Sequence, residues 1–334
     1  MLRCPAMPVL LAEKDVRAVL SMDDLIGVME LALQQFSAGD VRQPLRTVLQ
    51  ARHGLYGVMP AFIDSGRDRS PALGTKLVTV FHGNAARGLP SHLATIVLLD
   101  AETGALQAFM DGRYITEART AAVSAASAKH LARADARVLA VLGAGVQARS
   151  HIDAIPRVRP IEEIRIWGRH PARVRALIEE LMPSVSPRLV AASSARDAVR
   201  DADIVALVTA SPQPVMQRAW VRGGCHICAV GACRPDQREM DTALVKDARV
   251  FVDSRAGALA EAGDIVIPIA EGAIDASHIA GELGDVLAGR SPGRQAPDDI
   301  TIFKSLGMAV EDVAAARLVF DRASERGLGR GFVL

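Results

Sequence analysis

A glycine-rich turn in the middle of the sequence has the spacing of a dinucleotide-binding site. Residues 138–148 read VLAVLGAGVQA, so an apolar run ends in Gly143, and Gly145 and Ala148 follow at the G-x-G-x-x-A spacing. The run predicts a strand buried on both faces, residues 147–155 predict a helix, and residues 161–169 predict a second strand. The bare spacing also occurs in ordinary turns, so the prediction depends on this strand–turn–helix–strand frame.

The chemistry expected of this turn is the binding of phosphate groups. Gly143 permits the tight turn, Gly145 lets the backbone approach a pyrophosphate, and Ala148 allows the helix to pack closely on the strand. The start of the helix offers unpaired N–H groups and a partial positive charge. The residues assigned to the cofactor at this turn are Gly143, Ala144, Gly145, Val146 and Gln147.

The end of the second predicted strand indicates which dinucleotide binds. NAD sites usually have Asp or Glu at this point, where the carboxylate holds the 2′-hydroxyl of the adenine ribose. This chain has Gly168, Arg169 and His170 instead, and a guanidinium pairs well with a 2′-phosphate. The sequence therefore favours NADP(H), with NAD(H) as the alternative, and assigns these three residues to the cofactor. A solvated arginine at a helix start is the other interpretation.

Two different patterns lie on either side of residue 138. Strand-like stretches at 45–51, 56–64, 73–81, 91–100 and 103–111 are joined by short polar turns, which favours an antiparallel sheet. From 138 to about 300, strands alternate with helices, which is typical of a doubly wound parallel sheet. The predicted fold class is α/β, with a Rossmann domain over residues 121–304 and an N-terminal α+β antiparallel-sheet domain over 1–120 plus 305–334.

Three long helices complete this expectation. Residues 21–40 predict a helix with Ser21 as N-cap and Gly39 at its end, and the alanine-rich residues 114–132 predict another. The amphipathic residues 303–327 predict a last helix that packs on the N-terminal sheet. In the second half, strands are expected at 138–143, 163–168, 188–193, 203–210, 226–231 and 249–254, and 264–268 is a further candidate.

Composition restricts the class of partner. The 334 residues carry 39 Lys and Arg against 38 Asp and Glu, and the arginines are scattered, so no nucleic-acid partner is expected. The longest apolar runs are well short of the roughly 20 residues of a membrane span. The N-terminal residues lack the apolar core and cleavage site of a signal peptide. We therefore expect a cytoplasmic protein whose partner is a small molecule.

The cysteines predict neither a metal site nor a disulfide. Cys225 and Cys228 have C-x-x-C spacing, but they lie in a predicted strand, where residues three apart point to opposite faces. No second cysteine pair or histidine pair completes a zinc site. The four cysteines, which also include Cys4 and Cys233, are expected to be buried, reduced thiols.

Seven segments of the chain resemble the ornithine cyclodeaminase/mu-crystallin family. They are QPLRTVL, LGTKLVTVF, LPSH, TEARTAAVSAAS, VLGAGVQA, VGACRPDQRE and FKSLGMAVED, collinear between about residues 9 and 325. The resemblance implies that the N-terminal domain binds substrate and forms a homodimer, and that the Rossmann domain binds NAD(P)(H). Members of the family include cyclodeaminases, an amino-acid dehydrogenase and reductases of cyclic ketimines.

Three basic residues match the substrate pocket of that family. They are Arg46 in QPLRT, Lys76 in GTKLV and Arg119 in EARTAA. The residues themselves are consistent with this role, because a buried cation needs an anionic partner and a substrate carboxylate would supply one. Internal ion pairs, or side chains that extend to solvent, are the alternative interpretation. The resemblance assigns Arg46, Lys76, Arg119 and Ser91 to the substrate, with Lys76 as the catalytic residue.

Further residues are assigned to the cofactor, and one position departs from the family pattern. The assigned residues are His92, Arg119, Thr209 and Ser305. Cyclodeaminases carry a catalytic Asp in the motif GGDCPGKTE, whereas this chain reads GACRPDQRE with Cys233 at that position. Ketimine reductases also lack the Asp. The departure therefore favours the reductase branch.

The function predicted from these residues is NAD(P)H-dependent reduction of a cyclic ketimine carboxylate to an L-imino acid. Candidate substrates are Δ1-pyrroline-2-carboxylate and Δ1-piperideine-2-carboxylate. A lysine between two arginines should have a lowered pKa, which suits proton transfer to the ring nitrogen. One alternative is an ornithine cyclodeaminase or a deaminating amino-acid dehydrogenase that acts on an amino acid. The other is a non-enzymatic protein that binds NADPH or another small ligand.

Overall fold

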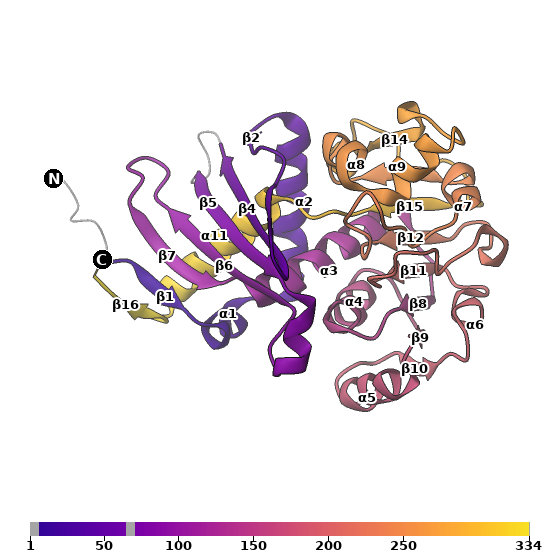
Figure 1. Cartoon of the computed structure of the whole chain (residues 1–334), viewed down its shortest axis with the longest axis horizontal. Helices are drawn as coiled ribbons and strands as arrows, with labels where there is room; N and C mark the ends of the chain where they lie inside the picture. The colour runs from indigo at the N-terminus through magenta and orange to yellow at the C-terminus, as the bar shows by residue number, and fades with distance from the viewer. Residues whose placement is uncertain (1–6, 65–70, 334) are drawn as a thin grey trace. The chain divides into compact units, whose positions relative to one another are not determined.

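The computed structural model describes residues 7–64 and 71–333, and the chain forms two compact units. Unit 1 comprises Met1–Arg119 and Met308–Leu334, and unit 2 comprises Thr120–Gly307. Cys4 lies outside the described residues. Each unit contains a sheet of its own (Figure 1).

The sheet of unit 1 is largely antiparallel. Its strand order is β16-β1-β7-β6-β5-β4-β2, and β3 also pairs with β4. The predicted antiparallel run is confirmed from β3 to β7, whereas β1 pairs with β7 in parallel. The strands are β1 (Val9–Leu11), β2 (Val41–Arg42), β3 (Thr47–Ala51), β4 (Gly54–Ile63), β5 (Ala72–Val80), β6 (His92–Leu99), β7 (Leu106–Asp111) and β16 (Arg330–Gly331).

Helices cover one face of this sheet. In β4 the buried residues Met59, Ala61 and Ile63 alternate with partly exposed ones, which places one face of the strand in the core. Helix α11 packs on β4, β5 and β6 and also contacts α2, and Figure 1 shows both helices on the same side of the strands. The helices of this layer are α1 (Glu13–Val19), α2 (Met22–Ala38) and α11 (Ala309–Glu325).

The ends of α2 agree with the prediction from the sequence, whereas the start of α11 does not. Ser21 is the N-cap of α2, and Gly39 ends it in the left-handed conformation, with φ of 86°. The last helix begins at Ala309, not at 303. The carboxylate of Asp253 accepts hydrogen bonds from the N–H groups of Leu306 and Gly307 at 2.6 and 2.8 Å, and Gly307 has φ of 79°. Residues 303 and 304 belong to a strand of unit 2, and these bonds fix the turn that follows it, so the prediction of a helix from 303 was wrong.

The sheet of unit 2 is parallel throughout. Its order is β10-β9-β8-β11-β12-β15-β13-β14, so the chain builds outward from β8 first in one direction and then in the other. This is the doubly wound topology expected from the sequence. The strands are β8 (Val138–Leu142), β9 (Glu163–Trp167), β10 (Arg188–Ala191), β11 (Ile204–Leu207), β12 (His226–Ala229), β13 (Arg249–Val252), β14 (Ile279–Glu282) and β15 (Thr301–Lys304).

Two apolar cores flank this sheet, one on each face. Residues of α4 (Val146–Ala154) and α5 (Pro171–Leu181) pack in one core, together with the C-terminal part of α3 (Gly112–Leu131). The other core contains residues of α6 (Ala195–Val199), α7 (Thr242–Asp247), α8 (Arg255–Glu261) and α9 (Gly263–Ala270). The short helix α10 (Leu283–Leu287) follows β14. The proposed strand at 264–268 was wrong, because these residues lie in α9.

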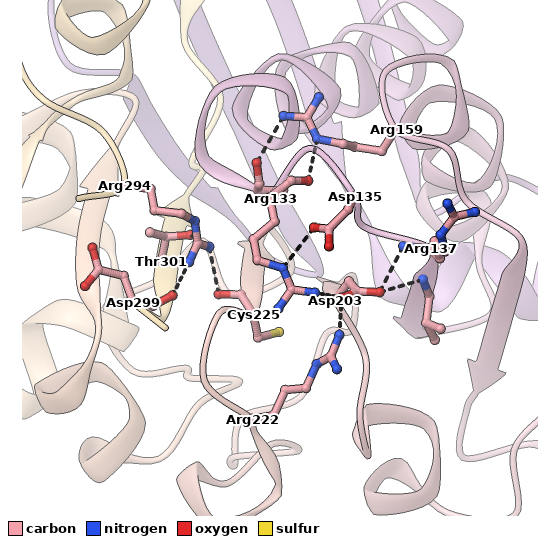
Figure 2. A network of polar contacts seen from close by, with 12 residues as sticks. Arg133, Asp135, Arg137, Arg159, Asp203, Arg222, Cys225, Arg294, Asp299 and Thr301 are labelled. Carbon is pink, nitrogen blue, oxygen red and sulfur yellow. Dashed lines mark hydrogen bonds and ion pairs between the residues drawn. The ribbon is translucent and has the colours of Figure 1, made fainter. Parts of the chain in front are cut away.

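A network of arginines occupies the amino ends of the parallel strands (Figure 2). Asp203, just before β11, pairs with Arg133 and Arg222 and accepts the backbone N–H groups of Arg137 and Val138 at the start of β8. Nearby, Arg159 and Arg294 donate to backbone carbonyls at the end of α3. Ligands of parallel sheets bind at the carboxyl ends of the strands, so this network at the opposite edge is structural.

Candidate functional site

The glycine turn of unit 2 leaves its backbone open on one side. Gly143 has φ of 133°, and a Cβ atom there would lie 2.7 Å from the carbonyl oxygen of Val208. Gly145 is the N-cap of α4, and a Cβ atom built on it would meet nothing within 4 Å. Ala148 is fully buried between helix and strand. One glycine is thus required by packing, whereas the other leaves space that a ligand can occupy.

The turn lies at the point where the order of the sheet reverses. It follows β8, which pairs with β9 on one side and with β11 on the other. In doubly wound sheets the crevice for a dinucleotide forms at the carboxyl ends of two such diverging strands. The open backbone at Gly145 and the start of α4 fit a pyrophosphate there. Val146 is exposed and Gln147 is half-buried at this helix start.

Strand β9, the second strand of the predicted dinucleotide-binding frame, ends just before Gly168, Arg169 and His170, as the sequence predicts. Strand β9 ends at Trp167, and a Cβ atom on Gly168 would already touch Val174 at 3.3 Å. Arg169 and His170 are both exposed, and His170 is the N-cap of α5. Within residues 7–64 and 71–333, Arg169 has no ion pair, whereas many other arginines of the chain are paired with carboxylates.

A buried carboxylate, which the sequence analysis did not single out, organises the same edge of the sheet. Glu239 accepts hydrogen bonds from the backbone N–H and the hydroxyl of Thr209, both at 2.7 Å, and from the N–H groups of Gly231 and Ala232. Burial raises the pKa of this carboxyl to about 7. The loops after β11 and β12 therefore both donate hydrogen bonds to the side chain of Glu239. These bonds fix the loop backbone at the edge of the sheet where a cofactor would lie.

A second buried pair supports this loop cluster. Asp264 accepts the N–H groups of Glu239 and Met240, and its other oxygen lies 3.0 Å from the ammonium of Lys304. Cys233 is half-buried in the loop after β12 and donates to the carbonyl of Val230 at 3.3 Å. Ser305 is 1% exposed, and its hydroxyl has no hydrogen-bond partner in the part of the chain that the structure describes. That orphaned hydroxyl also fits an incoming polar ligand.

In unit 1, Lys76 is buried on the helix-covered face of the sheet. It belongs to β5 and its side chain is 2% exposed. Its ammonium lies 2.5 Å from the carboxylate of Asp312, in the first turns of α11. Arg119, on α3, contacts the other oxygen of Asp312 at 3.0 Å and the carboxylate of Glu311 at 2.6 Å. A cluster of two cations and two acids therefore forms, which we call the α11 ion cluster: Lys76, Arg119, Glu311 and Asp312.

Burial is the main reason that the Lys76 pKa is lowered to about 8. The positive charges of Arg119 and Arg46 lower it further, whereas the charge and hydrogen bond of Asp312 raise it. Burial opposes ionisation of Asp312, but the two cations outweigh it and hold the Asp312 pKa below its usual range. The lowered Lys76 pKa was expected from the sequence, although burial was not identified as its main cause.

Of the remaining residues assigned to unit 1, Arg46 and His92 are near enough to the α11 ion cluster to share its charge interactions. Arg46 directly precedes β3 and is near enough to Lys76 to affect its charge. His92 begins β6, and burial, with the charges of Lys76 and Arg119, lowers its pKa to about 4. The imidazole is therefore neutral at neutral pH. Ser91 is half-buried beside it, and its carbonyl accepts the N–H of Phe81.

Sequence reasoning missed the acids of the α11 ion cluster. The two carboxylates are 192 and 193 residues from Arg119 in the chain, so no local pattern pairs them. A signal was available: Glu311 and Asp312 interrupt the apolar stretch GMAVEDVAAA, just as Lys76 interrupts a strand. Internal ion pairs, the alternative interpretation, are present for Lys76 and Arg119, and they do not exclude a substrate-binding role.

Two of the three described cysteines are buried as predicted, whereas Cys233 is half-buried and that part of the prediction was wrong. Cys225 and Cys228 are fully buried and free, as predicted. Burial raises the pKa of both thiols to about 12. Within the described ranges, no group of three or more His, Cys, Asp or Glu side chains is arranged to hold a metal ion. Over the same ranges, the helices include none long and apolar enough to cross a bilayer.

The strand order of unit 2 and its glycine turn define a Rossmann-type protein that carries an additional antiparallel-sheet unit. The profile of the ornithine cyclodeaminase/mu-crystallin family matches residues 7–327. The chain belongs to this family.

Relatives within the family are similar over almost the whole chain. Rat ketimine reductase mu-crystallin is 44% identical over 302 residues, which cover 89% of this chain and 91% of the rat protein. A Δ1-pyrroline-2-carboxylate reductase of Bacillus cereus is 34% identical, covering 96% of this chain and 98% of its own length. The solved structure of the Thermococcus litoralis Δ1-pyrroline-2-carboxylate reductase, in complex with NADH and L-proline, has a TM-score of 0.94 at 37% identity, covering 97% of this chain and all of that one.

Proposed function

We propose that this chain is an NAD(P)H-dependent reductase of cyclic ketimine carboxylates, and that its products are L-imino acids. The observation that carries the proposal is the buried Lys76 held beside Arg119, which offers a proton donor next to a carboxylate-binding guanidinium. The relatives named as ketimine and Δ1-pyrroline-2-carboxylate reductases support the substrate class. Unit 1 is accordingly the substrate-binding domain and unit 2 the dinucleotide-binding domain.

The three basic residues have two tasks in this reaction. Arg119 and Arg46 bind the carboxylate of the ketimine, since planar guanidinium groups suit carboxylates. The nicotinamide, when bound, supplies the hydride that C2 of the ring receives. Lys76 donates a proton to the ring nitrogen, because a protonated imine is the better hydride acceptor. Ser91 contributes to the substrate site, and His92 acts as a neutral contact rather than as an acid.

Most of the residues assigned to the dinucleotide belong to unit 2. Gly143, Ala144, Gly145, Val146 and Gln147 form the pyrophosphate turn, and Thr209 and Ser305 are further assigned contacts in this unit. His92 and Arg119, which the resemblance also assigns to the cofactor, belong to unit 1. The NADH in the Thermococcus litoralis structure supports a nicotinamide cofactor for this chain.

Substitution of the two turn glycines is expected to separate binding from stability. Gly145→Ala should leave the fold intact, because its Cβ atom meets open space, but should weaken dinucleotide binding about ten- to a hundredfold by blocking approach to the backbone. Gly143→Ala is the matched comparison and should lower stability by about 1–3 kcal/mol, because its φ and the contact with Val208 disfavour a side chain. Thermal unfolding and fluorescence titration with NADPH measure both. Equal affinity of wild type and Gly145→Ala would remove the turn from the cofactor site.

We infer that the preferred cofactor is NADP(H), because Arg169 is exposed at the end of β9. Arg169→Ala is expected to raise the KM for NADPH about ten- to a hundredfold, the value of a charge-assisted contact of roughly 1.5–3 kcal/mol. The KM for NADH should hardly change, because NADH lacks the 2′-phosphate. Steady-state kinetics with both cofactors tests this, and a wild-type enzyme that prefers NADH would refute it.

We propose a homodimer formed through unit 1, on the basis of exposed apolar side chains there. They are Leu45, Val48, Leu49, Leu89 and Leu93, all at least 40% exposed. Sedimentation should give about twice the 35.4 kDa of one chain, and a monomer would exclude the dimer.

The test that separates reduction from deamination uses L-ornithine. Cys233 stands where cyclodeaminases have an Asp, and its half-buried thiol donates to a backbone carbonyl. We therefore expect no ammonia from L-ornithine with NAD+, together with oxidation of NADPH by at least one cyclic ketimine. Ammonia release without ketimine reduction would replace the proposal by a deaminase.

A further inference from the structure

We propose that Asp312 is the positioning residue of this site: it holds Lys76 and Arg119 at fixed positions and keeps Lys76 charged for proton delivery to the ring nitrogen. The part of this inference that concerns the ring nitrogen rests on the proposed function. The part that concerns Lys76 and its charge rests on unit 1 alone.

One carboxylate bridges the two cations. One oxygen of Asp312 lies 2.5 Å from the Lys76 ammonium, and its other oxygen lies 3.0 Å from Nε of Arg119. Lys76 lies on β5 and Arg119 lies on α3, whereas Asp312 belongs to α11. Neither β5 nor α3 by itself sets the distance between the two cations. The carboxylate therefore fixes the separation between the proton donor and the guanidinium.

The Asp312 carboxylate is itself fixed in place. Its side chain is fully buried, and α11 packs on β4, β5 and β6. The start of α11 is tied to the rest of unit 1 by a hydrogen bond of 2.8 Å from the N–H of Val310 to the side-chain oxygen of Gln43. A rigid helix start is the kind of support that a preorganised site needs.

Asp312 is the negative charge that raises the proton affinity of Lys76. Arg119 on α3 and Arg46 before β3 also act on Lys76, and because both are positive they lower its pKa. His92 on β6 is neutral, with a pKa of about 4, and Glu311 pairs with Arg119. Without the charge of Asp312, burial and the two arginines would together favour the neutral amine.

The neighbouring acid provides a matched control. Glu311 lies one residue earlier on the same helix, is equally buried, and contacts Arg119 through its carboxylate. Both acids can be neutralised with little change in size, as Asp312→Asn and Glu311→Gln. Only the first change removes a contact of Lys76.

The test is the titration of Lys76 in protein labelled with 13C at the lysine Cε, with no substrate or cofactor present. The Lys76 signal is assigned by its loss in Lys76→Arg. Wild type should titrate near pH 8, and Asp312→Asn should lower this pKa by about 1–3 units, the usual effect of losing a close opposite charge. Glu311→Gln should lower it much less.

The pH profile of kcat/KM then tests the functional part. Activity should fall above the Lys76 pKa, because the proton donor is lost, and this alkaline limb should move to lower pH in Asp312→Asn in step with the titration. The limb of Glu311→Gln should stay near that of wild type, whatever its turnover. A shifted titration with no ketimine reduction in wild type would refute the proposed function alone.

Two results would overturn the inference itself. One is a Lys76 pKa that is unchanged in Asp312→Asn, or that shifts equally in Glu311→Gln. If Asp312→Asn does not fold, Asp312→Ser is the second charge-removing variant, because it leaves room for water. The second result is that neither Asp312→Asn nor Asp312→Ser folds while Glu311→Gln does. Asp312 would then be required for folding, and a role in setting the charge of Lys76 would have no support.

Discussion

Lys76→Met is expected to lower kcat/KM for Δ1-pyrroline-2-carboxylate by about 10²–10⁴, the usual contribution of a positioned general acid. The substitution keeps an unbranched side chain of similar length in the buried position on β5, so packing is retained. Asp312 keeps its contact with Arg119 and is not left as an isolated buried charge. The substitution should therefore slow the chemical step itself, and rapid-mixing kinetics of NADPH oxidation measures the rate of that step.

The control for this result is cofactor binding. Lys76 is not among the residues assigned to the dinucleotide, so the affinity for NADPH should stay within about twofold of wild type. A Lys76→Met enzyme that retains more than a tenth of wild-type kcat/KM would show that Lys76 is not the proton donor.

Arg119→Leu is expected to lower both turnover and stability. The substitution removes a carboxylate-binding group and leaves Glu311, and one oxygen of Asp312, buried without this partner. Breaking a buried ion pair by removing one member costs about 3–5 kcal/mol. We expect a loss of that order in the free energy of unfolding and a fall in kcat/KM of more than about a hundredfold, since the substrate carboxylate loses a charge-assisted contact of up to about 3 kcal/mol.

Arg113→Leu on the same helix is the matched control for stability. Arg113 pairs with Glu13, and both side chains are partly exposed, at 26% and 32%. Such a pair contributes about 0–1 kcal/mol. Urea denaturation should therefore separate the two variants clearly. If Arg119→Leu were as stable as Arg113→Leu and fully active, the α11 ion cluster would have neither a structural nor a functional role.

Local patterns were sufficient to predict most of the fold. The period-two alternation in β4 to β7 predicts antiparallel strands with one buried face, and the glycine turn after β8 predicts the start of the Rossmann unit. Where the pattern was ambiguous, long-range contacts decided the structure. Residues 265–267 are apolar and β-branched, yet they lie in α9, because a short apolar run does not by itself distinguish a strand from a helix.

In the candidate site too, local patterns predict some residues, and contacts between distant parts of the chain determine the others. Gly143 and Gly145 act within one turn, so their spacing predicts them once the strand–turn–helix–strand frame around it is recognised. Glu239 and Asp312 were missed because their partners lie in other elements of the fold, and a buried carboxylate has no spacing of its own. A charged residue inside an apolar stretch is the remaining signal, and it predicts that a partner exists without saying where.

The central claim is that this chain reduces cyclic ketimine carboxylates, and product analysis tests it most directly. Purified protein, NADPH and Δ1-pyrroline-2-carboxylate are mixed, and the oxidised cofactor and proline are quantified together, with proline resolved by chirality. We expect one L-proline to form for each NADPH oxidised, or one L-pipecolate when the six-membered Δ1-piperideine-2-carboxylate is supplied. Tight binding of NADPH with no imino acid formed from either ring would contradict it.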